Sequence, residues 1–307
     1  MSNRYHDLNT YLKQRYGERV HKISVDAGLN CPNRDGTLSR GGCIYCNTDG
    51  SGTGNFNKGI SIAEQIEAGI KAVSKRFHVK KFIAYFQSFT NTYAPVHQLK
   101  RIYEEALSLD EIVGLSIGTR PDCVNEPVLR LLEEYSRKYM IWIEYGLQSA
   151  HDKTLLRINR GHDADCFKRT VIATRNRGIQ ICAHVILGLP GETREEMLET
   201  AKFIGGLHLD GVKIHLLYVI KNTLLDTQYQ SGEYTCLEQN EYIQIVCDFL
   251  ELLPPEMVIQ RLTGDPHPNE LVAPLWALKK NQTLSGIKNE LEKRDSRQGK
   301  RYQRNLT

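Results

Sequence analysis

The chain lacks any long hydrophobic run. It has 307 residues with a mean hydropathy of -0.42, and no apolar stretch approaches the length needed to cross a bilayer. The opening residues, Met1-Ser2-Asn3-Arg4, do not start a charged segment followed by an apolar one, so we expect no export signal. The sequence therefore predicts a cytoplasmic protein that is not embedded in a membrane.

A strong net charge is also absent. There are 40 Lys and Arg against 36 Asp and Glu, which gives only +4 and does not by itself indicate a nucleic-acid partner. Nine of the basic residues and three of the acidic ones fall between Lys279 and Thr307, so the rest of the chain is close to neutral. A basic tail is a candidate for binding phosphate, and a solvated, frayed C-terminus is the alternative.

A fourth cysteine is missing from the most informative motif. Cys31, Cys43 and Cys46 form a C-x11-C-x2-C pattern in a glycine-rich stretch, and no further cysteine stands nearby. In the cytoplasm these thiols are expected to be reduced. Since four thiolates normally hold a cubane iron–sulfur cluster, three would leave one iron open to a substrate or cofactor.

Two other interpretations of the three cysteines remain. A structural zinc site needs four closed ligands, and His21, in a predicted strand, is the only nearby histidine. The cysteines could also be ordinary buried residues. Cys236 and Cys247 are too few and too widely spaced for a second cluster, and we interpret Cys123, Cys166 and Cys182 as buried or incidental.

Short β-branched or aromatic runs alternate with amphipathic segments of helical length, a pattern typical of repeated βα units with a parallel sheet. Strands are expected at 20–26, 81–87, 113–119, 140–147, 179–187 and 211–218. Helices are expected at 61–76, 96–108, 126–138, 164–177, 194–206 and 237–252, with a last one near 271–291. Asn125, before Glu126 and Pro127, is a candidate N-cap.

Six such units predict an α/β fold, a partial (β/α)6 barrel with a C-terminal helical extension. We expect the barrel at 1–253, the extension at 254–294, and a basic, disordered tail at 295–307. In parallel barrels the functional groups lie at the C-terminal ends of the strands. The candidate motifs each follow a predicted strand and should share this rim: Cys31, Gln87-Ser88, Thr119 to Asp122, Gln148, Gly188 and Tyr218 to Lys221.

The motifs as a set resemble those of a known superfamily. Cys43-Ile44-Tyr45-Cys46, with an aromatic residue before the last cysteine, resembles the cluster loop of radical S-adenosylmethionine enzymes, and the spacing from Cys31 is similar to the elongator catalytic subunit type. Four further segments also resemble motifs of the elongator catalytic subunit type: Thr119-Arg120-Pro121-Asp122, 144–149, 159–162 and 188–193. The segment 26–36 resembles a bacterial family of short, stand-alone members.

This resemblance implies the cofactors and their ligands. Cys31, Cys43 and Cys46 would hold a 4Fe-4S cluster with Tyr45 beside it. S-adenosylmethionine would chelate the open iron, and its reductive cleavage would give methionine and a 5′-deoxyadenosyl radical that abstracts a hydrogen atom. The electron would come from a low-potential donor such as flavodoxin or ferredoxin.

The resemblance also implies positions for S-adenosylmethionine. The segment Gln87-Ser88-Phe89-Thr90 falls where relatives bind the methionine amino group, and Gln148 and Arg160 match contacts to the ribose and the methionine carboxylate. Further cofactor positions are His184, Ile186 and Gly188 on the adenosine side, and Glu144 toward the ribose. His184 could instead be a satisfied core histidine, and Glu144 could simply pair with a lysine.

Several relatives of the elongator type act on tRNA, so the resemblance favours an RNA substrate. We expect no acetyltransferase domain after the barrel, and we therefore expect remodelling of the carbon-5 side chain of a wobble uridine, such as carboxymethylaminomethyl to aminomethyl. Candidate substrate-binding residues are Arg120, Asp122, Lys221 and Arg261, although the first two could pair with each other. The alternatives are a radical enzyme for a small molecule or protein side chain, and a zinc-dependent RNA-binding module.

Overall fold

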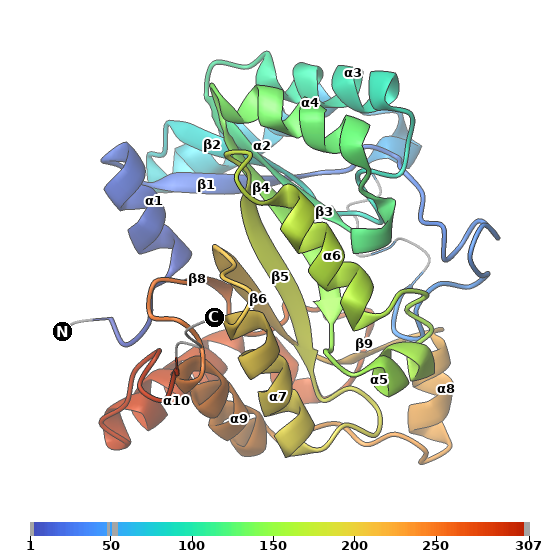
Figure 1. The fold of residues 1–307 in the computed structure, drawn as a ribbon, viewed down its shortest axis with the longest axis vertical. Coiled ribbons are helices and arrows are strands. Elements are labelled where there is room, and N and C mark those ends of the chain that lie inside the picture. Colours follow the sequence, from blue (N-terminus) through green and yellow to red (C-terminus); the bar gives the residue numbers. More distant parts are fainter. Residues whose placement is uncertain (1–2, 48–49, 51–54, 304–307) are drawn as a thin grey trace.

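The computed structural model describes residues 3–47, 50 and 55–303 (Figure 1). Seven parallel strands form one curled sheet in the order β1-β2-β3-β4-β5-β6-β8. Their bounds are β1 (Val20–Val25), β2 (Lys81–Phe86), β3 (Ile112–Thr119), β4 (Met140–Gln148), β5 (Gln180–Leu187), β6 (Gly211–Leu216) and β8 (Val258–Arg261). This confirms the partial α/β barrel, and β8, from the expected extension, adds a seventh strand.

Six helices connect successive strands, as expected, and cover the outer face of the sheet (Figure 1). They are α2 (Ile62–Phe77), α3 (Val96–Leu107), α4 (Glu126–Ser136), α6 (Ala164–Thr174), α7 (Arg194–Gly205) and α9 (Gln239–Glu251). Three helices were not expected: α1 (Leu8–Tyr16), α5 (Asp152–Arg157) and α8 (Leu224–Gln230). No helix among the described residues is long and apolar enough to span a membrane.

The prediction of a last helix near 271–291 was wrong in its first half. A two-stranded antiparallel pair, β7 (Val219–Ile220) with β9 (Leu271–Ala273), and a 3-10 turn (Leu275–Leu278) come first, and α10 (Lys280–Lys293) begins after them. Pro274 and the apolar residues around it fit this better than a helix interior, because proline removes a backbone donor.

Local capping explains where the covering helices begin. The Asn125 side chain accepts a hydrogen bond from the Val128 amide at 3.2 Å, which confirms it as the N-cap of α4. Ser61 with Glu64 forms a capping box at α2, and Thr193 with Glu196 forms one at α7. Two other short 3-10 turns lie at Phe56–Lys58 and Pro121–Cys123.

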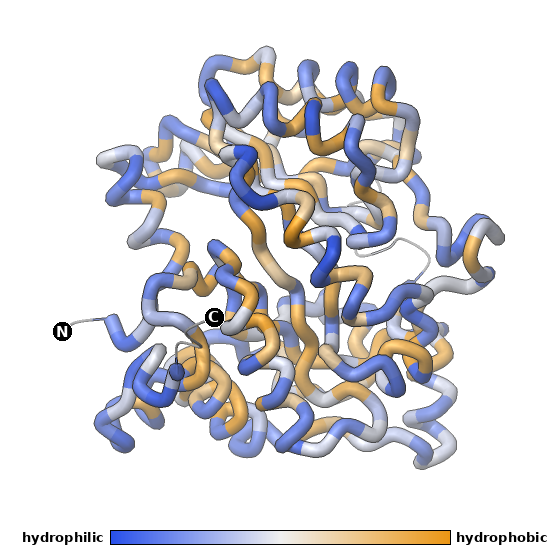
Figure 2. The backbone as a smooth tube through the Cα atoms, in the orientation of Figure 1, coloured by the Kyte–Doolittle hydropathy of each residue, from blue (hydrophilic) through white to orange (hydrophobic). Residues whose placement is uncertain are grey.

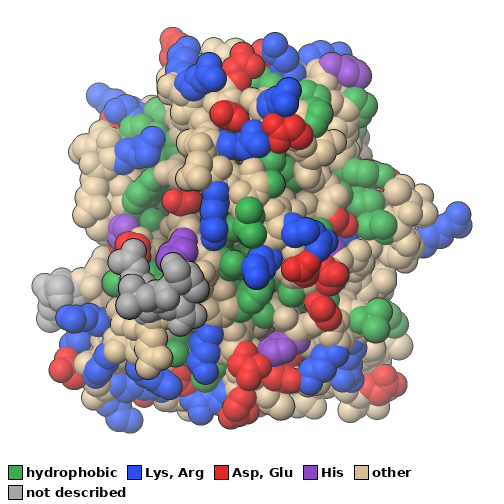
Figure 3. Space-filling model, in the orientation of Figure 1, with side chains coloured by type: hydrophobic (Ala, Val, Ile, Leu, Met, Phe, Trp, Pro, Cys, Tyr) green, Lys and Arg blue, Asp and Glu red, His purple; other side chains and the backbone are tan. Residues whose placement is uncertain are grey.

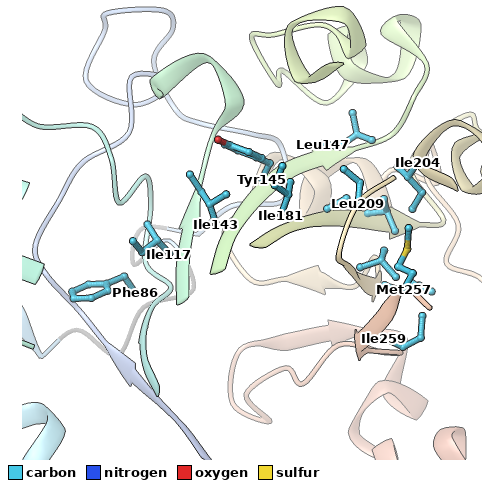
Figure 4. Packing of buried hydrophobic residues seen from close by; sticks show 14 of the residues in the cluster. Phe86, Ile117, Ile143, Tyr145, Leu147, Ile181, Ile204, Leu209, Met257 and Ile259 are labelled. Atoms are coloured by element: carbon cyan, nitrogen blue, oxygen red, sulfur yellow. The ribbon is translucent and has the colours of Figure 1, made fainter. Parts of the chain in front are cut away.

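The main core lies between the outer face of the sheet and its helices. Alternate strand residues such as Phe86, Ile117, Ile143 and Ile181 point to this side and are buried (Figure 4). The strands are hydrophobic along the tube in Figure 2, and each fully buried side chain of this kind contributes about 1.5–3 kcal/mol. This packing fixes the register, so the other alternate residues face the barrel interior.

A second apolar cluster closes the interior at the N-terminal ends of the strands. Leu12 of α1 packs there against inward-facing side chains that include Met140, Trp142, Cys182 and Val258. Tyr11 meets Trp142 edge to face at 6.0 Å between ring centroids. Helix α1 therefore closes the N-terminal end of the barrel interior, and the opposite end is the rim that carries the motifs.

The C-terminal segment corrects one expectation. Residues 295–303 pack on the body rather than being disordered: Gln298 is buried and its side chain donates to the carbonyls of Pro254 at 2.6 Å and Met257 at 2.8 Å. Arg294 pairs with Asp248 at 2.7 Å. Since part of the basic charge is used in this packing, the tail is a weaker phosphate-binding candidate; residues 304–307 lie outside the described part of the chain.

Candidate active site

The three motif cysteines lie on one folded loop after β1. Cys31 accepts a hydrogen bond at its carbonyl from the Arg34 amide at 2.8 Å, and the Cys46 amide donates to the Cys43 carbonyl at 2.9 Å, which forms a tight turn. All three thiols are free; Cys43 is buried, and Cys31 and Cys46 are half-buried. The loop therefore presents three sulfurs at the C-terminal rim of the barrel.

Positively charged and amide donors point at these sulfurs. Arg160 Nη1 lies 3.6 Å and Asn33 Nδ2 3.8 Å from Cys43 Sγ, and Arg34 Nη1 lies 3.4 Å from Cys46 Sγ. Burial, followed by the charge of Cys43, raises the pKa of the Cys46 thiol to about 11, while Arg34 opposes the rise. A bound cation would hold the thiolates, since the metal ligand is the deprotonated form.

The donor set fits a cluster better than a single ion. Among the described residues, no three His, Cys, Asp or Glu side chains are grouped to hold one metal ion. A cubane does not need such a grouping, because each cysteine binds a different iron atom. His21, the nearby zinc-ligand candidate, lies in β1, where its ring stacks on Phe77 at 5.3 Å. The three cysteines thus fit three irons of a 4Fe-4S cluster, and Tyr45 follows Cys43 on the same turn.

Gln148 and Arg160 are brought together at the end of β4. Arg160 donates to the Gly146 carbonyl through Nη2 at 2.7 Å and Nε at 3.2 Å. A Cβ on Gly146 would overlap Arg160 Nη2 and lie 2.7 Å from Gln148 Nε2, so both side chains cross the glycine. Gln148 has a φ of 77°, which is strained for a residue with a side chain and typical of functional positions.

The segment after β2 lies beside the cluster loop. Ser88 and Thr90 are buried, Gln87 is half-buried, and Thr90 Oγ1 has no hydrogen-bond partner among the described residues. The Phe89 ring lies 5.4 Å from the Arg34 guanidinium, and the backbone of Phe89 has a φ of 57°. This placement is compatible with the expected cofactor role of 87–90.

Arg120 and Asp122 pair with each other. Arg120 Nε and Nη2 donate to the two carboxylate oxygens of Asp122 at 2.9 and 2.7 Å. The Arg120 side chain is only 2% exposed, and its Nη1 has no partner among the described residues. Asn33 and Arg120 both lie near Gly161. The Asn33 Oδ1 atom also has no hydrogen-bond partner among the described residues. The rim pair is therefore formed, and the guanidinium nitrogen Nη1 is left without a partner among the described residues.

Glu144 and His184 lie one layer below the rim. His184 Nε2 is 2.8 Å from Glu144 Oε2, and Glu144 also contacts Lys22, Lys213 and Ser116. Burial lowers the pKa of His184 to about 4, so the neutral ring donates to the carboxylate. The charges of Lys213 and Lys22 hold the pKa of Glu144 well below its usual value, against its burial. This favours the lysine-pairing interpretation of Glu144 over a ribose contact.

The remaining expected residues are spread along the rim and the interior. Ile186 and Gly188 stand at the end of β5, and the Gly188 carbonyl accepts from the Tyr234 hydroxyl at 2.9 Å. Lys221 is exposed and donates to the Asn269 carbonyl at 2.8 Å. Arg261 is the last residue of β8 and is half-buried. Burial is the main cause of the lowered pKa of His215, and the positive charge of Arg261 is the second.

Sequence reasoning missed Lys22, Lys213 and Asn33. Lys22 and Lys213 each interrupt a hydrophobic strand at an inward-facing position. A charged residue inside a predicted buried strand was the available signal, and only the sheet register could pair each lysine with Glu144.

Comparisons with known proteins agree with this geometry. The family model described as Radical SAM superfamily matches residues 31–204, and the Radical_SAM C-terminal domain matches 209–293. YtqA of Bacillus subtilis (strain 168) is 44% identical over 98% of this chain and 94% of its own length. The tRNA uridine(34) acetyltransferase of Dehalococcoides mccartyi (strain CBDB1) is 27% identical over 53% of this chain and 36% of its own length.

A solved structure has the same fold. The archaeal Methanocaldococcus infernus Elp3 with an N-terminal deletion superposes with a TM-score of 0.68 at 19% identity, covering 91% of this chain and 64% of that one.

Proposed function

The chain belongs to the radical S-adenosylmethionine superfamily, and within it we propose that the enzyme modifies the carbon-5 side chain of a tRNA wobble uridine. As a member, it uses a 4Fe-4S cluster and S-adenosylmethionine. When bound, these supply a 5′-deoxyadenosyl radical that abstracts a hydrogen atom from the substrate.

The observation that carries the proposed cofactor chemistry is the contact between Arg160 and Cys43. The arginine is in contact with the cysteine loop at 3.6 Å and with Gly146 beside Gln148. We assign Arg160 to the methionine carboxylate, because a planar guanidinium suits a carboxylate, and Gln148 to the ribose. Further assigned cofactor contacts are Tyr45, Gln87, Ser88, Phe89, Thr90, Ile186 and Gly188.

The tRNA assignment is supported by relatives. The match to a tRNA uridine(34) acetyltransferase covers about half of this chain. The half-barrel is shared with an archaeal Elp3. We propose conversion of a carboxymethylaminomethyl group to aminomethyl in the cytoplasm, with an electron from flavodoxin or ferredoxin. The methylene between the amine and the carboxylate would lose a hydrogen atom to the 5′-deoxyadenosyl radical and one electron to the oxidised donor, and hydrolysis of the resulting imine would release glyoxylate. Asp122, Arg120 and Lys221 lie at the rim, where an RNA loop would approach.

The surface sets a limit on how RNA is held. On the face shown in Figure 3, basic and acidic side chains are interspersed and form no continuous basic field. We propose that RNA is held by a few specific contacts on the rim, and we expect only a moderate decrease in affinity as salt rises.

The test is a comparison of digested tRNA nucleosides from a deletion strain and its parent. We expect carboxymethylaminomethyl uridines to accumulate and aminomethyl uridines and their derivatives to fall, with recovery on complementation by the wild type but not by Cys43→Ala. Identical wobble nucleosides in the two strains would exclude this substrate. If tRNA also failed to stimulate 5′-deoxyadenosine release, a small-molecule or protein substrate would be favoured.

A further inference from the structure

We propose that Lys213 and Arg261 form an anion-binding site inside the half-barrel, and that it receives the carboxylate of the substrate side chain. The identity of the anion rests on the proposed function, whereas the site itself rests on the charges of the barrel interior. Both residues lie on neighbouring strands, with Lys213 of β6 opposite Arg261 of β8 in the register.

Lys22 is fully occupied and is not available to a ligand. An ammonium group has three donors. Those of Lys22 are taken by Glu144 Oε1 at 2.6 Å, Gln260 Oε1 at 2.7 Å and Ser116 Oγ at 2.8 Å. This lysine therefore neutralises the interior carboxylate.

Glu144 is likewise saturated. Its Oε1 accepts from Lys22 and Ser116, and its Oε2 accepts from His184 and Lys213. Two oxygens offer about four acceptor sites, so no further donor can be satisfied here. The carboxylate cannot compensate Arg261 as well.

Lys213 and Arg261 are left with unused donors. The Lys213 ammonium has one hydrogen-bond partner, Glu144, and otherwise lies 4.0 Å above the centroid of the Tyr85 ring. Within the described residues, the Arg261 side chain has no ion pair or hydrogen bond. When Lys213 is protonated, Lys22, Lys213 and Arg261 thus have a single ion-pair partner among the described residues, Glu144, which leaves an excess of positive charge.

This excess is reachable from the rim. On β6, His215 is two residues closer to the rim than Lys213 and is half-buried, and on the facing strands Ser24 is exposed and Gln87 half-buried. These positions face the barrel interior, so solvent reaches them from the rim. Lys213 itself is only 4% exposed, and the apolar cluster with Trp142 seals the space below. A ligand group inserted from the rim would end at the two cations.

An anion fits this site better than a neutral or cationic group. Burial lowers the pKa of Lys213, and the charges of Lys22 and Arg261 lower it further, against Glu144. A buried excess of like charge is costly unless it is paired. A carboxylate with two oxygens could take the Arg261 fork and a Lys213 donor together. The side chain of a carboxymethylaminomethyl uridine ends in such a group.

The first experiment uses bromide as the probe. Crystals of the holoenzyme soaked in sodium bromide should show an anomalous peak between Lys213 and Arg261. The peak should disappear in Arg261→Gln and persist in Lys168→Met, a control on the exposed outer face of α6. Its absence from the wild type would overturn the site.

The second experiment identifies the anion. We would measure the affinity for an anticodon stem-loop carrying the carboxymethylaminomethyl uridine and for its carboxamide. The wild type and Lys168→Met should prefer the acid by at least tenfold, and Arg261→Gln and Lys213→Met should prefer it by less than threefold. Since Lys213→Met could destabilise the fold, Arg261→Gln is the decisive variant. An unchanged tenfold preference in Arg261→Gln would overturn the inference.

Two other outcomes would also reassign the anion. Equal weakening of both stem-loops would point to a backbone phosphate, and a tenfold loss of S-adenosylmethionine affinity in Arg261→Gln would point to the cofactor carboxylate; either result overturns the carboxylate assignment. Unchanged wobble nucleosides in the deletion strain would remove the proposed function while leaving the bromide peak, so the two failures are distinguishable.

Discussion

The guanidinium of Arg160 lies 3.6 Å from the sulfur of Cys43, although the two residues are 117 positions apart in the sequence. One belongs to the loop after β1 and the other to the segment after β4 and α5. Their contact joins the cluster loop to the residues assigned to S-adenosylmethionine.

Replacing Arg160 by Gln should weaken S-adenosylmethionine binding by about tenfold or more, because a hydrogen bond to a charged group contributes about 1.5–3 kcal/mol. Equilibrium dialysis with the cofactor measures this. Arg130→Gln, on exposed α4, is the matched control and should bind normally. Normal affinity in Arg160→Gln would remove the assigned contact to the methionine carboxylate.

Gly146→Ala should act on the same site without replacing a charged residue. The new Cβ would overlap the Arg160 guanidinium and displace Gln148, so cofactor affinity should fall, and stability should fall by about 1–3 kcal/mol. Gly206→Ala is the control, because its Cβ would lie 3.6 Å or more from other atoms. Equal affinities in the two variants would contradict this geometry.

Glu144→Gln should strongly destabilise the protein. It leaves the buried Lys213 and the half-buried Lys22 facing a neutral amide, and removing one partner of a buried ion pair costs about 3–5 kcal/mol. Urea denaturation measures the free energy of unfolding. Glu126→Gln breaks exposed pairs with Arg130 and Arg177 and should cost about 1 kcal/mol or less. Similar losses in both variants would show that the interior pairing contributes little.

The acid preference of the interior site should fall as pH rises through about 7. Burial, although opposed by Glu144, lowers the pKa of Lys213 to about 7, so its positive charge is present below that pH and lost above it. The pKa values of the other titratable groups that face it lie away from 7: those of Glu144, His184 and His215 are lowered, and those of Tyr85 and Cys182 are raised. Stem-loop titrations from pH 6 to 9 test this.

The same shift has a consequence for stability. Above pH 7 the folded Lys213 has lost its proton, while an unfolded lysine keeps it until about pH 10.4. The unfolded chain therefore binds more protons in this window, and the contribution of Lys213 to the free energy of unfolding rises with pH. Lys213→Met should lack this rise. A parallel pH dependence in the variant and the wild type would contradict the lowered pKa.

The sequence was sufficient to predict the parallel half-barrel, because strands and helices alternate and capping residues such as Asn125 have a local signature. It also located the cysteines and the motifs on one rim. It did not predict the interior ion cluster, since the pairing of Lys22 and Lys213 with Glu144 depends on inter-strand register. The ordered segment around Gln298 was missed because its partners are distant carbonyls rather than neighbours in sequence.

The central claim is that this barrel carries out radical chemistry on S-adenosylmethionine, and anaerobic reconstitution tests it most directly. Wild-type protein should be brown, contain iron and sulfide, and release 5′-deoxyadenosine under strong reductant. Cys43→Ala should show none of these three properties, whereas Cys166→Ala, on α6, should match the wild type. A colourless wild type that retains zinc and releases no 5′-deoxyadenosine would contradict the account.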